Sequence, residues 1–188
     1  MFKPILSFLL LALSALPTLA QSQADTARAA AGCGPELADF DVKTDKKQHP
    51  APQPEAGKSM VFIIEELKTN DLGFTLGGVT TKVGIDGKWV GANKSDSYFF
   101  LPVDPGEHRL CSGWQSTLKR YSQLQNALTF TAEAGKTYYF RVLIYAEETD
   151  KRIPHLKLEA LDPAEAQLRI AVSGLSTSRQ KNTVAARD

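Results

Sequence analysis

The chain has 188 residues, 43% of them hydrophobic and 23% charged, which is the composition of a globular protein with a single core. Its 22 basic and 21 acidic residues nearly cancel, so the composition gives no electrostatic basis for binding nucleic acid or an anionic membrane surface. We therefore expect one folded domain and no nucleic-acid partner.

Residues 1–20 have the pattern of a secretory signal peptide. Lys3 supplies the positive start, residues 5–16 form an apolar run, and residues 18–20 place small side chains where a signal peptidase cleaves. The run is too short for a transmembrane helix. We therefore expect an exported protein, periplasmic or extracellular, with no transmembrane segment after cleavage.

Residues 21–36 are rich in Ala, Ser and Gln without periodicity, and we interpret them as a flexible linker. They contain Cys33, and the second cysteine of the chain is Cys111. An even cysteine count in an exported protein favours a disulfide between the two. The alternative is a lipoprotein anchored through Cys33, because residues 30–33 look like a lipoprotein cleavage box, although the apolar run ends well before them.

The first part of the folded domain contains two expected strands. Residues 40–44 alternate like a short edge strand, whereas residues 60–64 are apolar on both faces, as in a central strand. Between them, three prolines at every second position of residues 49–54 indicate an extended connector, because proline cannot donate a ladder hydrogen bond. Residues 68–78, with three glycines, are expected to form a loop.

Residues 82–114 are the best-specified stretch, with four short apolar runs separated by turn sequences. Asp86-Gly87 suits a two-residue hairpin, and residues 104–106 contain a Pro-Gly turn. This pattern predicts an antiparallel meander. If Leu110 faces the core, Cys111 faces the other side of its sheet, and the disulfide ties the N-terminal segment across that side.

The C-terminal part combines strands with one helix. Residues 114–126 are expected to form a loop, with a short helix as the alternative, and further strands are expected over residues 127–131, 137–145 and 156–160.

A helix is expected to start at Asp162, which is followed by proline at the first helical position and by Glu165 three residues after the cap. Its apolar stripe is expected to contain Leu168, Ala171, Val172 and Leu175. The polar segment 176–188 is expected to be a disordered tail.

These elements predict an all-β domain over residues 37–175, an antiparallel β-sandwich of seven or eight short strands with one short C-terminal helix. A small closed barrel is the alternative.

Several of these motifs together resemble a known bacterial family, the domain of unknown function 2846 family. The matching motifs lie at residues 57–58, 83–88, 97–99, 103–108 and 134–139. The resemblance covers residues 57–175 and implies an exported, immunoglobulin-like sandwich. The motifs are turn and strand signatures, so they imply an architecture and carry over no catalytic residue.

Residues that commonly carry out chemistry are isolated in this sequence. His49, His108 and His155 have no neighbours at metal-ligand spacing, and we expect no metal and no cofactor. Ser112 and Ser173 lack the glycine elbow of a serine nucleophile. We therefore predict that the protein is not an enzyme, and we keep a hydrolase as the least favoured alternative.

Aromatic residues are the better candidates for a binding site. Trp89 follows a hairpin, and Trp114 and Tyr121 flank a loop that also contains Lys119 and Arg120. Such rings beside hydrogen-bond donors bind sugars or peptides in many proteins. The alternative interpretation is that Trp114 closes the core and Trp89 covers its hairpin.

The sequence thus predicts a non-catalytic interaction module at the bacterial cell envelope, with an unknown envelope protein or glycan as its partner. The alternative is a module that binds a glycan or small molecule through the loop aromatics.

Overall fold

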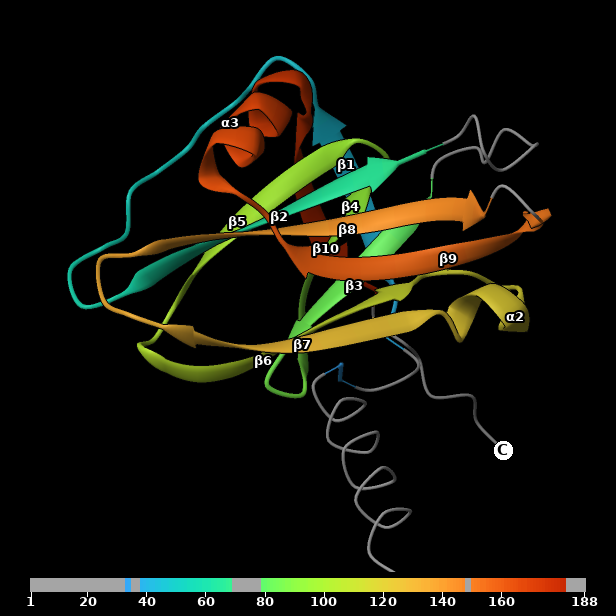
Figure 1. The fold of residues 1–188 in the computed structure, drawn as a ribbon, viewed down its shortest axis with the longest axis horizontal. Helices are drawn as coiled ribbons and strands as arrows, with labels where there is room; N and C mark the ends of the chain where they lie inside the picture. The colour runs from blue at the N-terminus through green and yellow to red at the C-terminus, as the bar shows by residue number, and fades with distance from the viewer. Residues whose placement is uncertain (1–32, 35–37, 69–78, 148–149, 182–188) are drawn as a thin grey trace, which may run out of the picture.

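The computed structural model describes residues 33–34, 38–68, 79–147 and 150–181. Within these ranges the chain forms ten strands and two helices, arranged in two β-sheets (Figure 1). The expected signal peptide, most of the expected linker, and residues 69–78 of the expected loop lie outside the described residues, as do residues 182–188.

Sheet A contains six strands and sheet B contains four. In spatial order, sheet A is β1 (Phe40–Asp45), β10 (Gly174–Gln180), β5 (Ser97–Val103), β2 (Ser59–Leu67), β8 (Thr137–Glu147) and β9 (Asp150–Ala160). Sheet B is β4 (Lys88–Lys94), β3 (Thr80–Ile85), β6 (Gly106–Trp114) and β7 (Gln125–Ala132). The helices are α2 (Lys119–Ser122) and α3 (Pro163–Val172). The described residues do not form the closed barrel that was the alternative.

The expectation of seven or eight strands in a purely antiparallel arrangement is wrong in two respects. The described residues contain ten strands, and sheet A is mixed because β2 pairs with β8, and β10 with β5, in parallel. The hairpin at Asp86-Gly87 forms as predicted, with both residues at positive φ. The predicted meander over residues 82–114 is wrong at β5, which pairs in sheet A, whereas β3, β4 and β6 lie in sheet B. The turn at Asp104–Gly106 therefore leads from one sheet to the other; a turn sequence shows where the chain reverses but does not identify the partner of the next strand.

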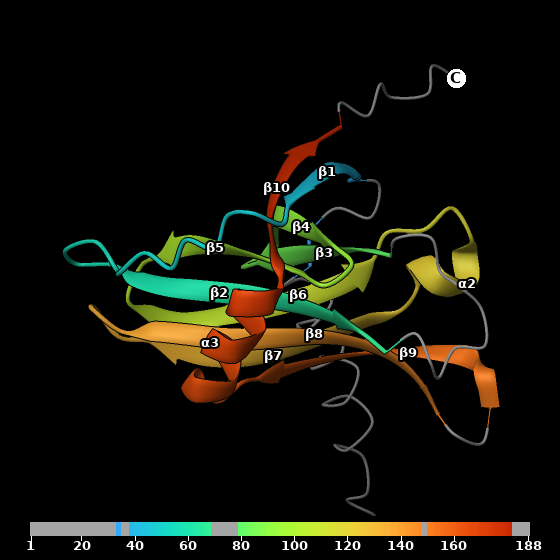
Figure 2. The same ribbon diagram turned by 90° about the horizontal axis from the view of Figure 1, so that it is seen from above.

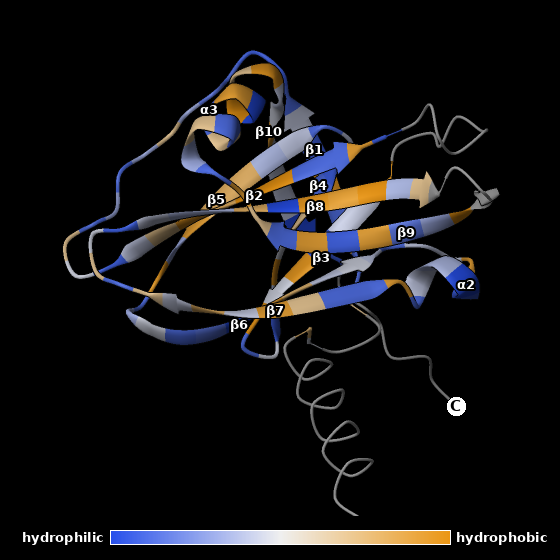
Figure 3. Ribbon diagram, in the orientation of Figure 1, coloured by the Kyte–Doolittle hydropathy of each residue, from blue (hydrophilic) through white to orange (hydrophobic). Residues whose placement is uncertain are grey.

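One cluster of buried side chains draws on both sheets. Val61 and Ile63 of β2 meet Leu110 of β6 and Val142 of β8 in this cluster, and all four are inaccessible to solvent. Met60, Phe62 and Ile64 of β2 are buried on the opposite face, as expected for a segment that is apolar on both faces. Strand β9, in contrast, alternates between hydrophobic and hydrophilic residues (Figure 3).

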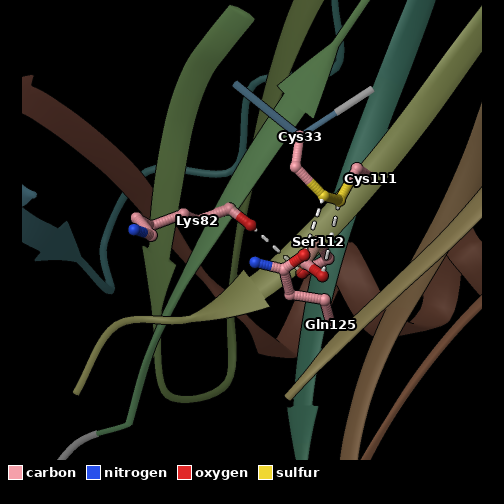
Figure 4. Close-up of a disulfide and its surroundings, with 5 residues drawn as sticks. All are labelled: Cys33, Lys82, Cys111, Ser112 and Gln125. Atoms are coloured by element: carbon pink, nitrogen blue, oxygen red, sulfur yellow. Dashed lines mark hydrogen bonds between the residues drawn. A yellow bond between two sulfur atoms is a disulfide. The ribbon is translucent and has the colours of Figure 1, made fainter. Parts of the chain in front are cut away.

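Cys33 and Cys111 form the predicted disulfide, with Cα atoms 4.9 Å apart (Figure 4). Cys111 lies on the face of sheet B opposite Leu110, where it belongs to a separate buried cluster with Trp89. The bridge therefore holds the N-terminal segment against this second face, as the alternation along β6 predicts.

Helix α3 covers part of the outer face of sheet A, above β2 and β8 (Figure 2). Its cap is the predicted one, because the Asp162 carboxylate accepts hydrogen bonds from the backbone N–H groups of Ala164 at 2.8 Å and Glu165 at 3.3 Å. The predicted apolar stripe is wrong. Leu168 and Val172 are 71% and 81% exposed.

The stripe that is buried instead consists of Ala166 and Ile170. These residues lie one turn apart, so the helix meets the sheet along a narrow line rather than a broad face. Leu175, the fourth residue of the expected stripe, belongs to strand β10.

The expected disordered tail is wrong for residues 176–180, which belong to β10. This strand pairs with β1 over six residues, from Phe40 opposite Gln180 to Asp45 opposite Leu175. Backbone pairing with an edge strand does not need apolar side chains, and the serines of β10 supply further bonds. The Ser178 hydroxyl accepts from the Ala92 N–H at 3.1 Å.

The segment 114–126, for which a loop was favoured, contains the single helical turn α2. Tyr121 is its buried residue, and the Trp114 N–H closes the segment by donating to the Leu124 carbonyl at 3.0 Å.

Candidate functional site

The candidate site lies on the outer face of sheet A, and its floor follows from strand register. Phe62 of β2 is paired with Tyr139 of β8, so both rings point to the side of the sheet that carries α3. The two rings stack with centroids 5.2 Å apart and planes at 30°. Phe62 is 1% exposed, whereas Tyr139 is partly exposed and forms the accessible part of the floor.

Two walls rise from this floor and enclose a cavity of about 280 Å³, which we call the α3 cavity. One wall is the proline-rich connector between β1 and β2, and the other is the side of α3 (Figure 1). The lining residues are His49, Ala51, Pro52 and Gln53 of the connector, Phe62, Thr137 and Tyr139 of the sheet, and Gln167, Ile170 and Ala171 of the helix.

The connector is held in place at two points. His49 Nδ1 lies 3.2 Å from the carbonyl oxygen of Ile170 near the C-terminal end of α3, and the Tyr98 hydroxyl donates to the Pro50 carbonyl at 2.9 Å. Burial raises the pKa of Tyr98 to about 12, so this hydroxyl keeps its proton at neutral pH. Together with the fixed φ angles of the prolines, these bonds make the cavity preformed.

The amide and hydroxyl side chains of the α3 cavity are uncharged and available. The side chains of Gln53, Thr137 and Gln167 and the hydroxyl of Tyr139 make no hydrogen bond with any described residue. Because a carbonyl can only accept, His49 Nδ1 donates in its contact with the Ile170 oxygen, and Nε2 makes no hydrogen bond with any described residue. The cavity therefore combines an aromatic floor with several uncommitted donors and acceptors, the usual composition of a small-ligand site.

A second cavity, of about 330 Å³, lies on the other side of α3, and we call it the charged cavity. Its lining is Lys46, Ile64, Glu65, Glu66, Asp96, Arg169, Val172 and Ser173. Glu65 is completely buried, and burial raises its pKa from 4.5 to about 8 although the Thr81 hydroxyl and the Ser95 N–H both donate to its carboxyl group. Glu65 is thus largely protonated at pH 7.

An ion-pair network beside the charged cavity fixes α3 to the sheet. Arg141 of β8 pairs with Glu66 of β2 at 3.2 Å, with Glu159 of β9 at 2.5 Å and with Glu165 of α3 at 3.2 Å. Arg169 of the helix pairs with Glu66 and Glu165, each at 3.3 Å. These charges satisfy one another and leave little capacity for a ligand.

The structure does not bring the sequence-predicted aromatic residues together at an open surface. Trp114 and Tyr121 stack with centroids 4.8 Å apart, and they are only 5% and 7% exposed. Trp89 is buried in the separate cluster that contains the disulfide. Trp114 therefore closes the core, as the alternative interpretation stated.

The two basic residues predicted to take part in binding, Lys119 and Arg120, are both exposed. The Arg120 guanidinium lies over the Tyr121 ring, 4.4 Å from its centroid. The role of these five residues in binding stays a prediction, and the burial of the three rings does not favour it.

His108 forms a separate polar constellation at the tips of two turns. Its Nδ1 lies 2.7 Å from the Asp86 carboxylate, and its Nε2 lies 2.7 Å from the Asp104 carbonyl oxygen. Partial burial of the ring opposes protonation, but these two acceptors outweigh it and raise the pKa of His108. Lys58 adds a bond to the Asp104 carboxylate at 2.6 Å. This imidazole joins turns together and is not free to act as a base.

A family model described as a protein of unknown function (DUF2846) matches residues 55–152, just over half of the chain. The chain belongs to the DUF2846 family. This result confirms the resemblance drawn from the turn and strand motifs, although the match ends before α3, whereas the resemblance extended to residue 175. Comparison with curated proteins finds no match.

Only the floor of the α3 cavity belongs to the residues matched by the DUF2846 family model. The floor residues Phe62, Thr137 and Tyr139 lie inside the matched range, whereas the connector wall and the helix wall lie outside it. The sequence did not reveal His49, Gln53 or Gln167 as site residues, because each is an isolated polar residue. The available signal was that β2 and β8 are apolar on both faces, which requires a cover over sheet A.

Two further findings concern the described residues of this DUF2846 protein. No helix among them has the length and apolar character needed to cross a membrane. They also contain no group of three or more His, Cys, Asp or Glu side chains placed to hold a metal ion.

Proposed function

We propose that this protein is an exported, non-catalytic binding module of the bacterial cell envelope, and that its ligand occupies the α3 cavity. The observation that carries the proposal is the chemistry of that cavity, a preformed hollow with an aromatic floor and uncommitted neutral polar groups. Such hollows bind ligands through shape and a few hydrogen bonds.

The state of the candidate nucleophiles and bases supports a non-catalytic role. Both Cys33 and Cys111 are joined in the disulfide, so neither offers a thiol to a histidine. His49 and His108 bond to carbonyl or carboxylate oxygens rather than to a hydroxyl group. A hydrolase would need a nucleophile within hydrogen-bond reach of a base.

The proposed location rests on the N-terminal pattern and on the disulfide. Residues 1–20 have the order of features of a secretory signal, and structural disulfides persist in oxidising compartments such as the periplasm. We also keep the immunoglobulin-like sandwich as the proposed fold class, which is supported by two sheets that share one buried cluster. The partner would be an envelope protein or glycan.

Filling the α3 cavity tests the proposed function. Ala171→Trp places a large ring in the cavity, whereas Leu168→Trp places the same ring on the solvent-facing side of the same helix. We expect the mature wild-type protein and Leu168→Trp to recover the same component from envelope extract, and Ala171→Trp to lose it. Trp114 is unsuitable as a probe because it is buried, and its removal would disturb the core.

Equal recovery by all three proteins would contradict the proposal, and so would the absence of any specific component with the wild type. Circular dichroism of both variants shows whether the fold is retained.

A further inference from the structure

We infer that the α3 cavity binds one ring of a neutral saccharide, with the face of the sugar on Tyr139 and its hydroxyl groups between the two walls. This inference deepens the proposed function and rests on it. It follows from the charge, the polar groups, the floor and the size of the cavity.

The charge of the lining excludes most ionic ligands. None of the ten lining residues is Asp, Glu, Lys or Arg. Phosphate and carboxylate groups are normally held by Arg or Lys, and ammonium groups by carboxylates. Arg169, which lines the charged cavity, and Arg141 beside it are already paired with glutamates. A neutral ligand is therefore the one that the α3 cavity fits.

The polar groups match hydroxyl groups in particular. Gln53 on the connector and Gln167 on the helix present amides from opposite walls, and each amide both donates and accepts. Thr137 and Tyr139 add hydroxyl groups at the floor. A sugar ring carries hydroxyl groups around its edge, and each of these also donates and accepts, so opposite edges of one ring can be satisfied at once.

The floor and the volume match a single ring. Tyr139, the accessible ring of the floor, is backed by the buried Phe62 and offers an apolar surface against which the C–H groups of a sugar face can pack. A volume of about 280 Å³ is just below the range of roughly 300–1,000 Å³ typical of ligand pockets. The cavity therefore suits one ring rather than a long chain.

Two other neutral ligands fit less well. An extended peptide would need backbone partners along the connector, but Pro50, Pro52 and Pro54 have no N–H group to donate. An acyl chain would cover the Thr137 and Tyr139 hydroxyl groups at the floor without giving them a hydrogen-bond partner, which is unfavourable.

The test titrates the full mature protein with neutral sugars and charged comparators. The probes are glucose, galactose and N-acetylglucosamine, against glucuronate and inorganic phosphate, with binding measured by saturation-transfer NMR and calorimetry. We expect at least one neutral sugar to bind at millimolar concentration or below, and the charged probes to bind at least tenfold more weakly.

The variants locate the binding. Gln167→Ala removes one wall amide from an exposed helical position, and we expect a loss of affinity of about threefold to tenfold, the effect of one neutral hydrogen bond. Gln123→Ala, an exposed glutamine next to α2 and outside the cavity, is the matched control and should bind like the wild type. Tyr139→Phe keeps the ring and should bind more tightly than Tyr139→Leu.

Three results would each overturn the inference: no neutral sugar binds, glucuronate binds as tightly as the neutral sugars, or Gln167→Ala and Ala171→Trp bind sugar like the wild type.

The failure of this inference can be distinguished from the failure of the proposed function. If no sugar binds but Ala171→Trp still abolishes recovery of the envelope component, the saccharide inference fails and the proposed function stands.

Discussion

The two sides of helix α3 differ in chemistry although they share one helix and one face of sheet A. On one side, the outward side chains of β2 and β8 are Phe62 and Tyr139, and the amide and hydroxyl side chains of the α3 cavity are uncharged and make no hydrogen bond with a described residue. Further along the same strands, the outward side chains are Glu66 and Arg141, and they are fully engaged in ion pairs. The charged side holds the helix in position, and the neutral side remains available for a ligand.

This contrast separates residues that stabilise the fold from residues that are available for binding. Substitutions on the charged side should alter the free energy of unfolding without changing ligand binding. Substitutions in the α3 cavity should weaken ligand binding without changing the free energy of unfolding. Three predictions test the first half of that statement, and the cavity variants described above test the second.

The largest expected effect is the pH dependence that comes from Glu65. Its pKa is about 8 in the folded protein and 4.5 when unfolded, so the native state binds the proton more tightly. Its contribution is therefore complete below pH 4.5 and is lost as the pH rises to about 8, by an amount on the order of 4 kcal/mol. We expect the free energy of unfolding, measured with urea at a series of pH values, to fall over this range.

Glu65→Gln should remove most of this slope, and Glu66→Gln should retain it. The window between pH 4.5 and 6.5 is the most informative one. His108 has a raised pKa, so its own contribution is lost only as the pH rises above 6.5. If the free energy of unfolding of Glu65→Gln fell with pH as steeply as that of the wild type, Glu65 would not be the cause of the pH dependence.

A smaller effect is expected from Arg141, which joins β8 to β2, β9 and α3. Arg141→Met keeps the apolar stem but leaves three carboxylates without their shared partner, and we expect a loss of about 2 kcal/mol in urea unfolding. The control is Arg179→Met, because Arg179 is almost fully exposed and lies 3.8 Å from Asp41. Equal effects of the two substitutions would mean that the network does not anchor the helix.

The smallest expected effect on stability is the difference between substitutions at two residues of α3. Glu165 contacts Arg141 and Arg169 and lies in the first turn of the helix, so Glu165→Gln should cost about 0.5–1 kcal/mol. Gln167 contacts no described polar group, so Gln167→Ala should leave the thermal midpoint almost unchanged. If Gln167→Ala destabilised the protein more than Glu165→Gln, the two sides of the helix would not divide their roles as described.

Local features of the fold were predictable from the sequence, whereas features that depend on distant partners were not. The hairpin at Asp86-Gly87, the Asp162 cap and the opposite orientations of Leu110 and Cys111 follow from residues within a few positions of each other. The parallel pairing of β2 with β8 could not be predicted, because alternation along a strand does not identify its neighbour.

The candidate site was missed for the same reason. Its walls come from the connector and from α3, which are far apart in the sequence, and the side of α3 that faces the sheet depends on contacts with distant strands. Hydrophobicity alone favoured Leu168 and Val172 as the buried stripe, but both are exposed. Likewise, Trp114 and Tyr121 attracted attention as aromatic residues beside basic ones, and only their burial shows that they close the core.

The parallel pairing of β2 with β8 also sets the order in which the chain is able to fold. Met60 pairs with Thr137, so the central strand of sheet A lacks one neighbour until the segments that form β3 to β7 have been synthesised. Contacts between segments so distant in sequence form slowly, and an apolar strand with an open edge is prone to aggregate in the meantime. We therefore expect the chain to be most prone to aggregation during refolding before β8 has paired with β2.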